Sequence, residues 1–300
     1  MSTEPDLFKG FEAITIDVGS VTIFARTGGN GPPLLLLHGY PQTHACWHKL
    51  APALARNHTV VVPDLRGYGR SSCPPSDATH RAYAKRTMAN DMLQLMAKQG
   101  FARFAVMGHD RGARVAYRLT LDYPDAVSRL AIVDIISTLD QWRPEHQTTR
   151  DRIHHWAFMA QPAPLPETLI AANARDWIEA RLKRGARGNV LTGFDPAALD
   201  DYVRSHADPD RIHAACEDYR AGATCDLADD RKDFDASNKI VVPTLVAWGS
   251  VGSLADIADP LAVWRPWCTN LFGARIESGH YIPEDNPDAL LAYAESIFKP

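Results

Sequence analysis

The stretch Met107–Ala116, MGHDRGARVA, decides the predicted fold, because it joins a predicted strand (101–110) to a predicted helix (111–124). At its centre, GHDRG (108–112), a glycine stands two residues to either side of Asp110. A sharp strand-to-helix turn needs small flanking residues and exposes the central side chain, which is most often a serine. Asp110 therefore predicts a carboxylate nucleophile. The alternative is an ordinary turn with an acidic helix cap.

The segments around this turn alternate between short apolar runs and helix-like stretches. Strands are predicted at 13–18 and 21–26 as a hairpin, at 32–39, at the start of 58–71 and at 127–135, with helices at 43–56 and 88–100. Such alternation is typical of a sheet whose two faces are covered by helices. The predicted fold class is α/β, with a mostly parallel, doubly wound sheet.

The alternation stops near Leu139. From Asp140 to Phe234 the sequence is helical in character, and apolar strand patterns resume only at KIVVPTLVAWGS (239–250). We therefore predict a core domain of residues 1–139 and 235–300, interrupted by a helical cap of residues 140–234. Ligands of open α/β sheets bind at the carboxyl ends of the strands, so a cap inserted there would cover the site.

The composition is that of an ordinary globular protein. The 300 residues are 45% hydrophobic and 23% charged, with a net charge of −4, which gives no basic face for nucleic acid. The first 13 residues lack the features of a signal peptide, and no apolar run reaches membrane-spanning length. We expect a cytoplasmic protein without a membrane segment or a metal site. Scattered cysteines agree with this expectation: Cys46, Cys73, Cys216, Cys225 and Cys268.

A catalytic base is predicted late in the chain, where the order nucleophile, acid, histidine requires it. His280 follows Gly279 in a loop after the last predicted strand, although it is one of 12 histidines and a surface role is the alternative. The acid is predicted as Asp134, which ends the strand after the nucleophile helix. Asp256 is the alternative acid, and a helix cap is the alternative role of Asp134.

An oxyanion site is predicted beside the nucleophile. The segment HGYPQ (38–42) ends an earlier strand, and its Tyr40 N–H group and that of Arg111 are placed to donate to one oxygen. A carboxylate that attacks a saturated carbon forms an alkyl ester and expels a leaving group. Water activated by His280 would then attack the carboxyl carbon of Asp110. This chemistry indicates hydrolysis of a carbon–halogen bond or of an epoxide.

The chain resembles the α/β-hydrolase superfamily and, within it, the haloacetate (fluoroacetate) dehalogenases, over nearly its whole length. The resemblance implies an α/β-hydrolase fold and a triad of Asp110, Asp134 and His280. It is carried by LLLLHGYPQTHACWHKLAP (34–52), PDLRGYGRS (63–71), GHDRGARVAYRL (108–119), HWAFMAQPAPLPE (155–167), CEDYRAGA (216–223) and IESGHYIPE (276–284).

Two arginines beside the nucleophile predict a substrate with its own negative charge. Arg111 and Arg114 lie one helical turn apart and are suited to hold a substrate carboxylate over Asp110. Surface salt bridges are the alternative, one that suits Arg118 better. Haloalkane dehalogenases, which resemble this chain less, tend to carry tryptophan at the position of Arg111.

By resemblance, the leaving halide is bound by three cap residues: His155, Trp156 and Tyr219. The alternative to halide binding is burial in the core of the cap for Trp156 and exposure to solvent for His155. The segment 180–190 departs from the relatives, because it lacks a tryptophan that lines their access channel, and Gly185 stands near that place. This departure bears on the size of the preferred substrate.

We therefore expect hydrolysis of a small anionic haloacid, from fluoroacetate or chloroacetate to glycolate and halide, without metal or organic cofactor. Resemblance also implies a homodimer. The enzymatic alternative is an epoxide hydrolase that uses Tyr219 as an acid, but it gives Arg111 and Arg114 no role. A non-catalytic receptor on this fold is the alternative of another class, disfavoured because all three triad residues are present.

Overall fold

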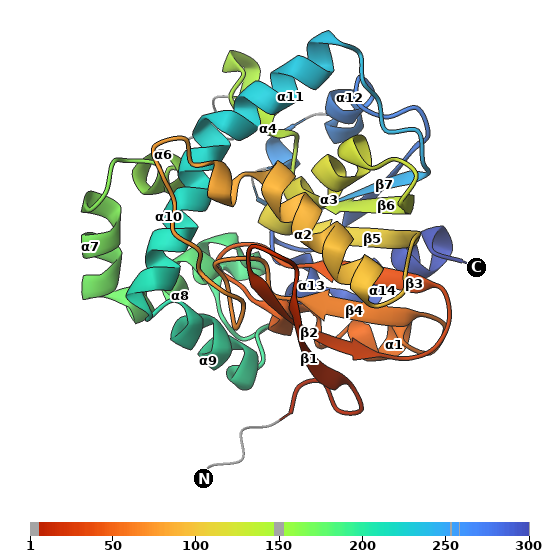
Figure 1. Ribbon diagram of the computed structural model, residues 1–300, viewed down its shortest axis with the longest axis horizontal. Helices are drawn as coiled ribbons and strands as arrows, with labels where there is room; N and C mark the ends of the chain where they lie inside the picture. Colours follow the sequence, from red (N-terminus) through yellow and green to blue (C-terminus); the bar gives the residue numbers. More distant parts are fainter. Residues whose placement is uncertain (1–5, 147–152, 253, 258, 300) are drawn as a thin grey trace.

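The computed structural model describes residues 6–146, 153–252, 254–257 and 259–299. Its centre is one eight-stranded sheet in the order β1-β2-β4-β3-β5-β6-β7-β8 (Figure 1). β2 pairs antiparallel with both β1 and β4, and all other neighbours are parallel, so the predicted mostly parallel sheet is confirmed. The strands are β1 Glu12–Asp17, β2 Thr22–Gly28, β3 Pro33–Leu37, β4 Thr59–Pro63, β5 Phe104–His109, β6 Val127–Val133, β7 Thr244–Gly249 and β8 Leu271–Ile276.

Helices cover both faces of this sheet. α2 and α3 lie in front of it and α14 lies behind it in the view of Figure 1. The helices of this part are α1 Ala51–Leu54, η2 Arg81–Tyr83, α2 Lys85–Lys98, α3 Arg111–Asp122, η5 Leu254–Asp256, α12 Pro260–Trp264, α13 Ile282–Asp285 and α14 Pro287–Ile297.

The helix predicted over 43–56 is wrong as a single element. The structure has a short 3₁₀ helix, η1 (His44–Trp47), followed by α1. Pro52 lies in the first turn of α1 and lacks an N–H group, and its ring would clash with the carbonyl of His48 in a continuous helix. The chain therefore ends one helix and begins another.

Between β6 and β7, the elements that the described residues form are all helices, joined by turns and loops. α6 to α10 gather beside one edge of the core, at the left of Figure 1. The helices are α4 Thr138–Gln141, η3 Pro144–His146, α6 His155–Met159, α7 Leu165–Ala172, α8 Ala174–Gly185, η4 Arg187–Asn189, α9 Pro196–Ser205, α10 Pro209–Ala223 and α11 Cys225–Asp235. The core and cap boundaries at 139/140 and 234/235 stay predictions, and both fall inside a helix, α4 and α11 respectively.

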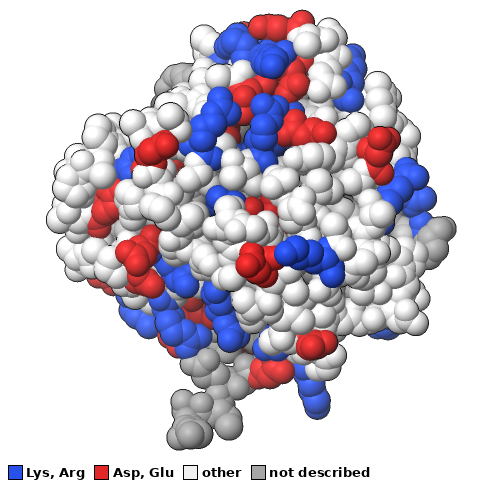
Figure 2. Space-filling model, viewed as in Figure 1, with Lys and Arg blue, Asp and Glu red and all other residues white. Residues whose placement is uncertain are grey.

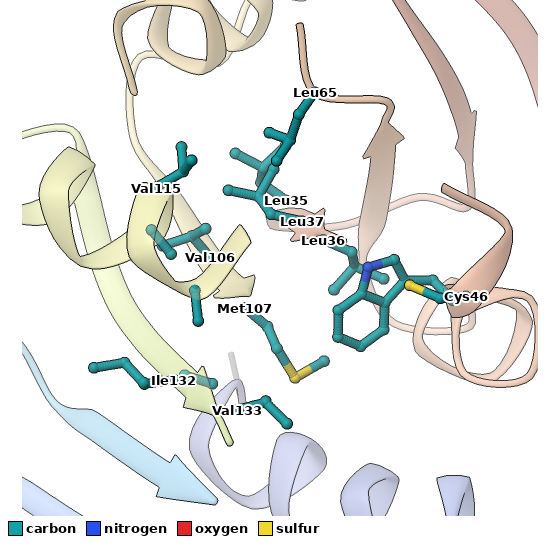
Figure 3. Packing of buried hydrophobic residues seen from close by; sticks show 14 of the residues in the cluster. Leu35, Leu36, Leu37, Cys46, Leu65, Val106, Met107, Val115, Ile132 and Val133 are labelled. Atoms are coloured by element: carbon teal, nitrogen blue, oxygen red, sulfur yellow. The ribbon is translucent and has the colours of Figure 1, made fainter. Parts of the chain in front are cut away.

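The core consists of apolar strands that are buried on both faces. Residues 34–37 of β3 and 60–62 of β4 have no exposed surface, which explains their unbroken apolar sequence. In Figure 3, Val106 of β5 lies beside Val115 of α3, while Met107 extends to the other side of the sheet. The alternation of side chains along β5 therefore joins both helical layers to one core.

Charged side chains of both signs lie together on the face shown in Figure 2. Arg86 of α2 pairs with Asp122 at 2.8 Å and with Asp229 of α11 at 3.1 Å. Arg118 is not the surface residue that the sequence suggested, because it is buried between Asp122 and Asp233 at 3.0 and 2.6 Å. Among the described helices, none is both long and apolar enough to cross a membrane.

Candidate active site

Asp110 stands in the tight turn between β5 and α3. Its φ of 50° and ψ of −121° lie outside the regions that non-glycine residues favour. Glycines make this turn possible: a Cβ on Gly108 would lie 2.4 Å from the Gly112 carbonyl oxygen, and one on Gly112 would lie 2.3 Å from that of His38. The turn places Asp110 between the end of β5 and the start of α3, the place at which the sequence predicts a nucleophile.

The structure brings the three predicted triad residues together. His280 Nδ1 lies 2.6 Å from Asp134 Oδ2, and His280 Nε2 lies 3.4 Å from Asp110 Oδ2. The Gly249 N–H group of β7 donates to Asp134 Oδ1 at 2.9 Å, which fixes this carboxylate. Asp134, rather than the alternative Asp256, therefore occupies the position that orients the imidazole.

The charges of the triad are strongly coupled. Burial opposes the charge on His280, but its contacts with Asp110 and Asp134 raise its pKa to about 10. Burial would likewise raise the pKa of Asp110, yet the contact with His280 and the charge of Arg111 hold that pKa well below its usual value. These opposite shifts favour the ion pair of a carboxylate and an imidazolium.

A backbone donor reaches the Asp110 carboxylate. The Tyr40 N–H group donates to Asp110 Oδ1 at 2.8 Å. The Arg111 N–H group lies close by, because a Cβ built on Gly39 would be 2.6 Å from Arg111 N and 2.4 Å from Asp110 Oδ1. Of the two predicted donors, Tyr40 thus makes its bond in the structure, while the Arg111 amide lies at the first position of α3.

Substitution of Gly39 with alanine is expected to lower kcat at least about 10-fold with a smaller change in KM, because the new methyl group would displace the Asp110 carboxylate. Steady-state kinetics on chloroacetate, a substrate predicted from the sequence, measure this effect. Gly193→Ala is the control: Gly193 also lies in a turn, its φ is outside the left-handed region, and its added Cβ would meet only Asp285 Oδ1, at 3.3 Å. Equal rates in the Gly39→Ala variant and the wild type would contradict the expectation.

A cavity of about 280 Å³ opens over the triad. Asp110, Asp134 and His280 line it from the core, and Arg114 adds a positive charge. His155 and Trp156 of α6 line it from the helical insertion. The predicted site residues of core and insertion thus meet at the carboxyl ends of the strands.

The two predicted carboxylate-binding arginines have different surroundings. Arg114 lines the cavity; its Nη1 donates to Thr138 Oγ1 at 3.0 Å, and its buried Nε has no hydrogen-bond partner among the described residues. Arg111 is fully buried, and its Nε and Nη2 bind Asp218 at 3.0 and 2.6 Å. Only Nη1 of Arg111 lacks a partner within the described part of the chain. Arg114 is the more available of the two cations.

The three predicted halide-binding residues form one aromatic cluster. His155 Nε2 lies 3.1 Å from the Tyr219 hydroxyl, and the rings of Trp156 and Tyr219 meet edge-on at 5.7 Å. The Trp156 ring also faces the guanidinium carbons of Arg111 and Arg114, at 5.0 and 4.5 Å. His155 and Trp156 line the cavity. Tyr219 is not among the lining residues but contacts one of them, His155.

This cluster is neutral. Burial first, and then the charge of Arg181, lower the pKa of His155 well below its usual value. Burial and the charge of Asp110 raise the pKa of Tyr219. One N–H or O–H group donates in the hydrogen bond between these two side chains. If His155 Nε2–H is the donor, the Tyr219 hydroxyl proton stays free, and if the Tyr219 hydroxyl is the donor, His155 Nδ1–H stays free. Nδ1 is buried without a partner among the described residues.

Sequence reasoning missed two buried supports of the site. Asp218, which binds Arg111, also pairs with Lys85. His109 Nε2 lies 2.8 Å from the His280 carbonyl oxygen, so a hydrogen bond between them would fix the backbone of the loop that carries His280. Asp218 directly precedes Tyr219 in a stretch that the resemblance singled out, but its pairing joins segments 107 residues apart.

Gly185 joins the insertion to the loop that carries His280. Its carbonyl accepts the His280 N–H group at 2.7 Å, and a Cβ on Gly185 would lie 2.6 Å from the Tyr281 ring. The place where a larger side chain was expected is therefore filled by Tyr281. Within the described residues, no group of three or more His, Cys, Asp or Glu side chains could hold a metal ion.

Comparisons with known proteins agree with this architecture. The family model "alpha/beta hydrolase fold" matches residues 32–287. Fluoroacetate dehalogenase from Burkholderia sp is 42% identical over 94% of this chain and 92% of its own, and soluble epoxide hydrolase from Corynebacterium sp. (strain C12) is 32% identical over 91% and 92%. The crystal structure of ALR0039 from Nostoc sp PCC 7120 superposes with a TM-score of 0.93 at 44% identity, covering 96% of this chain and 98% of its own. The chain belongs to the α/β-hydrolase family.

Proposed function

We propose that this protein hydrolyses the carbon–halogen bond of short 2-haloacids, converting fluoroacetate or chloroacetate to glycolate and halide. The observation that carries the proposal is the buried, incompletely bonded guanidinium of Arg114 in the same cavity as the carboxylate of Asp110. A substrate carboxylate would satisfy Arg114 and bring its α-carbon to Asp110. The 42% identity to fluoroacetate dehalogenase supports this substrate class.

In the first step, Asp110 Oδ2 attacks the α-carbon and the halide departs with the bonding electrons. An ester joins Asp110 to the rest of the substrate. Oδ1 remains bound to the Tyr40 N–H group, which leaves Oδ2 as the attacking atom. Trp156 and the free donor of the His155–Tyr219 pair are suited to bind the departing halide.

The second step hydrolyses this ester. Ester formation removes the charge of Asp110 and thereby lowers the pKa of His280, which releases its proton to solvent and becomes a base. His280 Nε2 then takes a proton from water, and the resulting hydroxide attacks the carboxyl carbon of Asp110. The Tyr40 N–H group stabilises the oxyanion that forms on Oδ1. His280 returns the proton to the departing glycolate oxygen.

Halide release from fluoro-, chloro- and bromoacetate tests this proposal. The folded wild-type protein is expected to release one halide and one glycolate per substrate consumed. Ion chromatography of both products measures the reaction. Release of halide from none of the three would exclude the proposed function.

Epoxide hydrolysis is the second candidate, because Tyr219 and the 32% identical epoxide hydrolase both favour it. A Tyr219 hydroxyl could protonate the opening ring oxygen while Asp110 attacks carbon. This candidate leaves the buried charge of Arg114 without a role. Turnover of styrene oxide but not of chloroacetate would favour it. The homodimeric assembly and cytoplasmic location stay predictions from the sequence.

A further inference from the structure

The cavity is larger than a two-carbon haloacid requires. Its volume of about 280 Å³ approaches the roughly 300–1,000 Å³ of pockets that bury drug-sized ligands, whereas chloroacetate has only a handful of non-hydrogen atoms. Beyond the predicted site residues, Arg181, Arg184 and Asn189 of α8 and η4 and Gly252 and Leu254 after β7 also line the cavity. A substrate held at Arg114 alone would leave part of the cavity to water.

Arg181 is the charged group of interest among these residues. It lines the cavity from α8 and is half-buried. Its backbone is fixed, since the neighbouring Leu182 is fully buried and the Tyr281 hydroxyl donates to the Arg181 carbonyl at 3.4 Å. Within residues 6–146, 153–252, 254–257 and 259–299, its guanidinium forms no hydrogen bond or ion pair. Other cations of α8 are paired instead, as Arg175 and Lys183 are with Glu179.

No carboxylate of the described residues forms an ion pair with Arg181. Its charge acts on Tyr40, His155, Tyr219 and Tyr281, which are all neutral, and contributes to the lowered pKa of His155. The nearby carboxylate of the site, Asp110, is already paired with His280. A half-buried cation among neutral rings is stabilised most by an anion that enters with the ligand.

We propose that Arg181 forms a second anion subsite, so that the enzyme also takes 2-haloacids with a second carboxylate, of which 2-chlorosuccinate is the simplest probe. The α-carboxylate binds at Arg114, on the core wall, and the distal carboxylate binds at Arg181, on the wall of the insertion. Asp110 displaces chloride from the carbon between them, and water then releases the hydroxy diacid and a proton. This inference rests on the proposed hydrolysis of 2-haloacids.

The test compares kcat/KM for 2-chlorosuccinate and for 2-chlorobutanoate, which has the same carbon chain but one carboxylate. The wild type is expected to prefer 2-chlorosuccinate. Arg181→Met is expected to lower the ratio of the two kcat/KM values about 10- to 100-fold, mainly through KM for the diacid, because one charge-assisted hydrogen-bonding group is lost. Arg181→Lys should restore part of the ratio.

Lys183→Met is the matched control, because it removes a cation from the same helix at an exposed, paired position. Its ratio is expected to equal that of the wild type. A wild type without preference for the diacid, or an Arg181→Met variant that slows both substrates equally, would overturn the inference. Chloroacetate is assayed with the same variants. If chloroacetate is hydrolysed but one of these two results is found, only the second subsite is contradicted. If no substrate releases halide, the proposed function is contradicted as well.

Discussion

Substitution of Asp110 with asparagine is expected to lower kcat for halide release from chloroacetate by about 10⁴-fold or more. The amide has nearly the same size and can still accept the Tyr40 N–H bond, but it cannot form the alkyl ester. Chloride release measures the loss. The mass of the peptide that contains residue 110 shows that the asparagine persists.

Asp125→Asn serves as the control, because Asp125 is exposed at the far end of α3 from the nucleophile. This variant should keep the wild-type rate. Wild-type turnover in Asp110→Asn protein whose asparagine is intact would contradict the assignment of the nucleophile. Such a result would indicate that water attacks the substrate directly, without an ester on Asp110.

Substitution of His280 with glutamine is expected to separate the two steps. Ester formation needs only the carboxylate of Asp110, while hydrolysis needs the base, so the variant should release about one halide per site and then stop. The peptide that contains Asp110 should gain the mass of a carboxymethyl group after exposure to chloroacetate. Peptide mass spectrometry and a stopped-flow assay of halide measure both results.

His213→Gln is the corresponding control, because the His213 side chain is exposed and pairs with Glu167 outside the cavity. It should turn over repeatedly and leave Asp110 unmodified. An unmodified peptide in the His280→Gln variant, together with sustained halide release, would contradict the two-step scheme. Loss of all halide release would instead mean that His280 is needed for the first step.

The local sequence predicts those parts of the site that depend on a single turn or strand end. Asp110 and Asp134 lie at the ends of predicted strands and His280 lies in the loop after the last one, and parallel strands place these ends at one edge of the sheet. The break at Pro52 could also have been predicted, since a proline in a helix interior removes a hydrogen bond. The helix-like sequence of the other residues in 43–56 favoured a single helix and outweighed this signal.

Pairings between distant segments were not predictable in this way. The partner of Arg111 is Asp218, and no local pattern links a helix after β5 with a helix of the insertion. The burial of Arg118 depends in the same manner on Asp233 of α11. Arg181 was missed because only the packing of α8 decides which of its cations faces the cavity. Each of these features is determined by tertiary packing.

The hydrogen bond from the His280 amide to the Gly185 carbonyl has a consequence for protein engineering. The helical insertion and the loop of the base share a tightly packed seam, since a Cβ on Gly279 would lie 2.3 Å from the Gly185 oxygen and 2.6 Å from Arg187 N. The insertion is therefore not an exchangeable module. A chimera that takes this segment from a relative must take the matching loop around Gly279 with it, or the imidazole will lose its alignment.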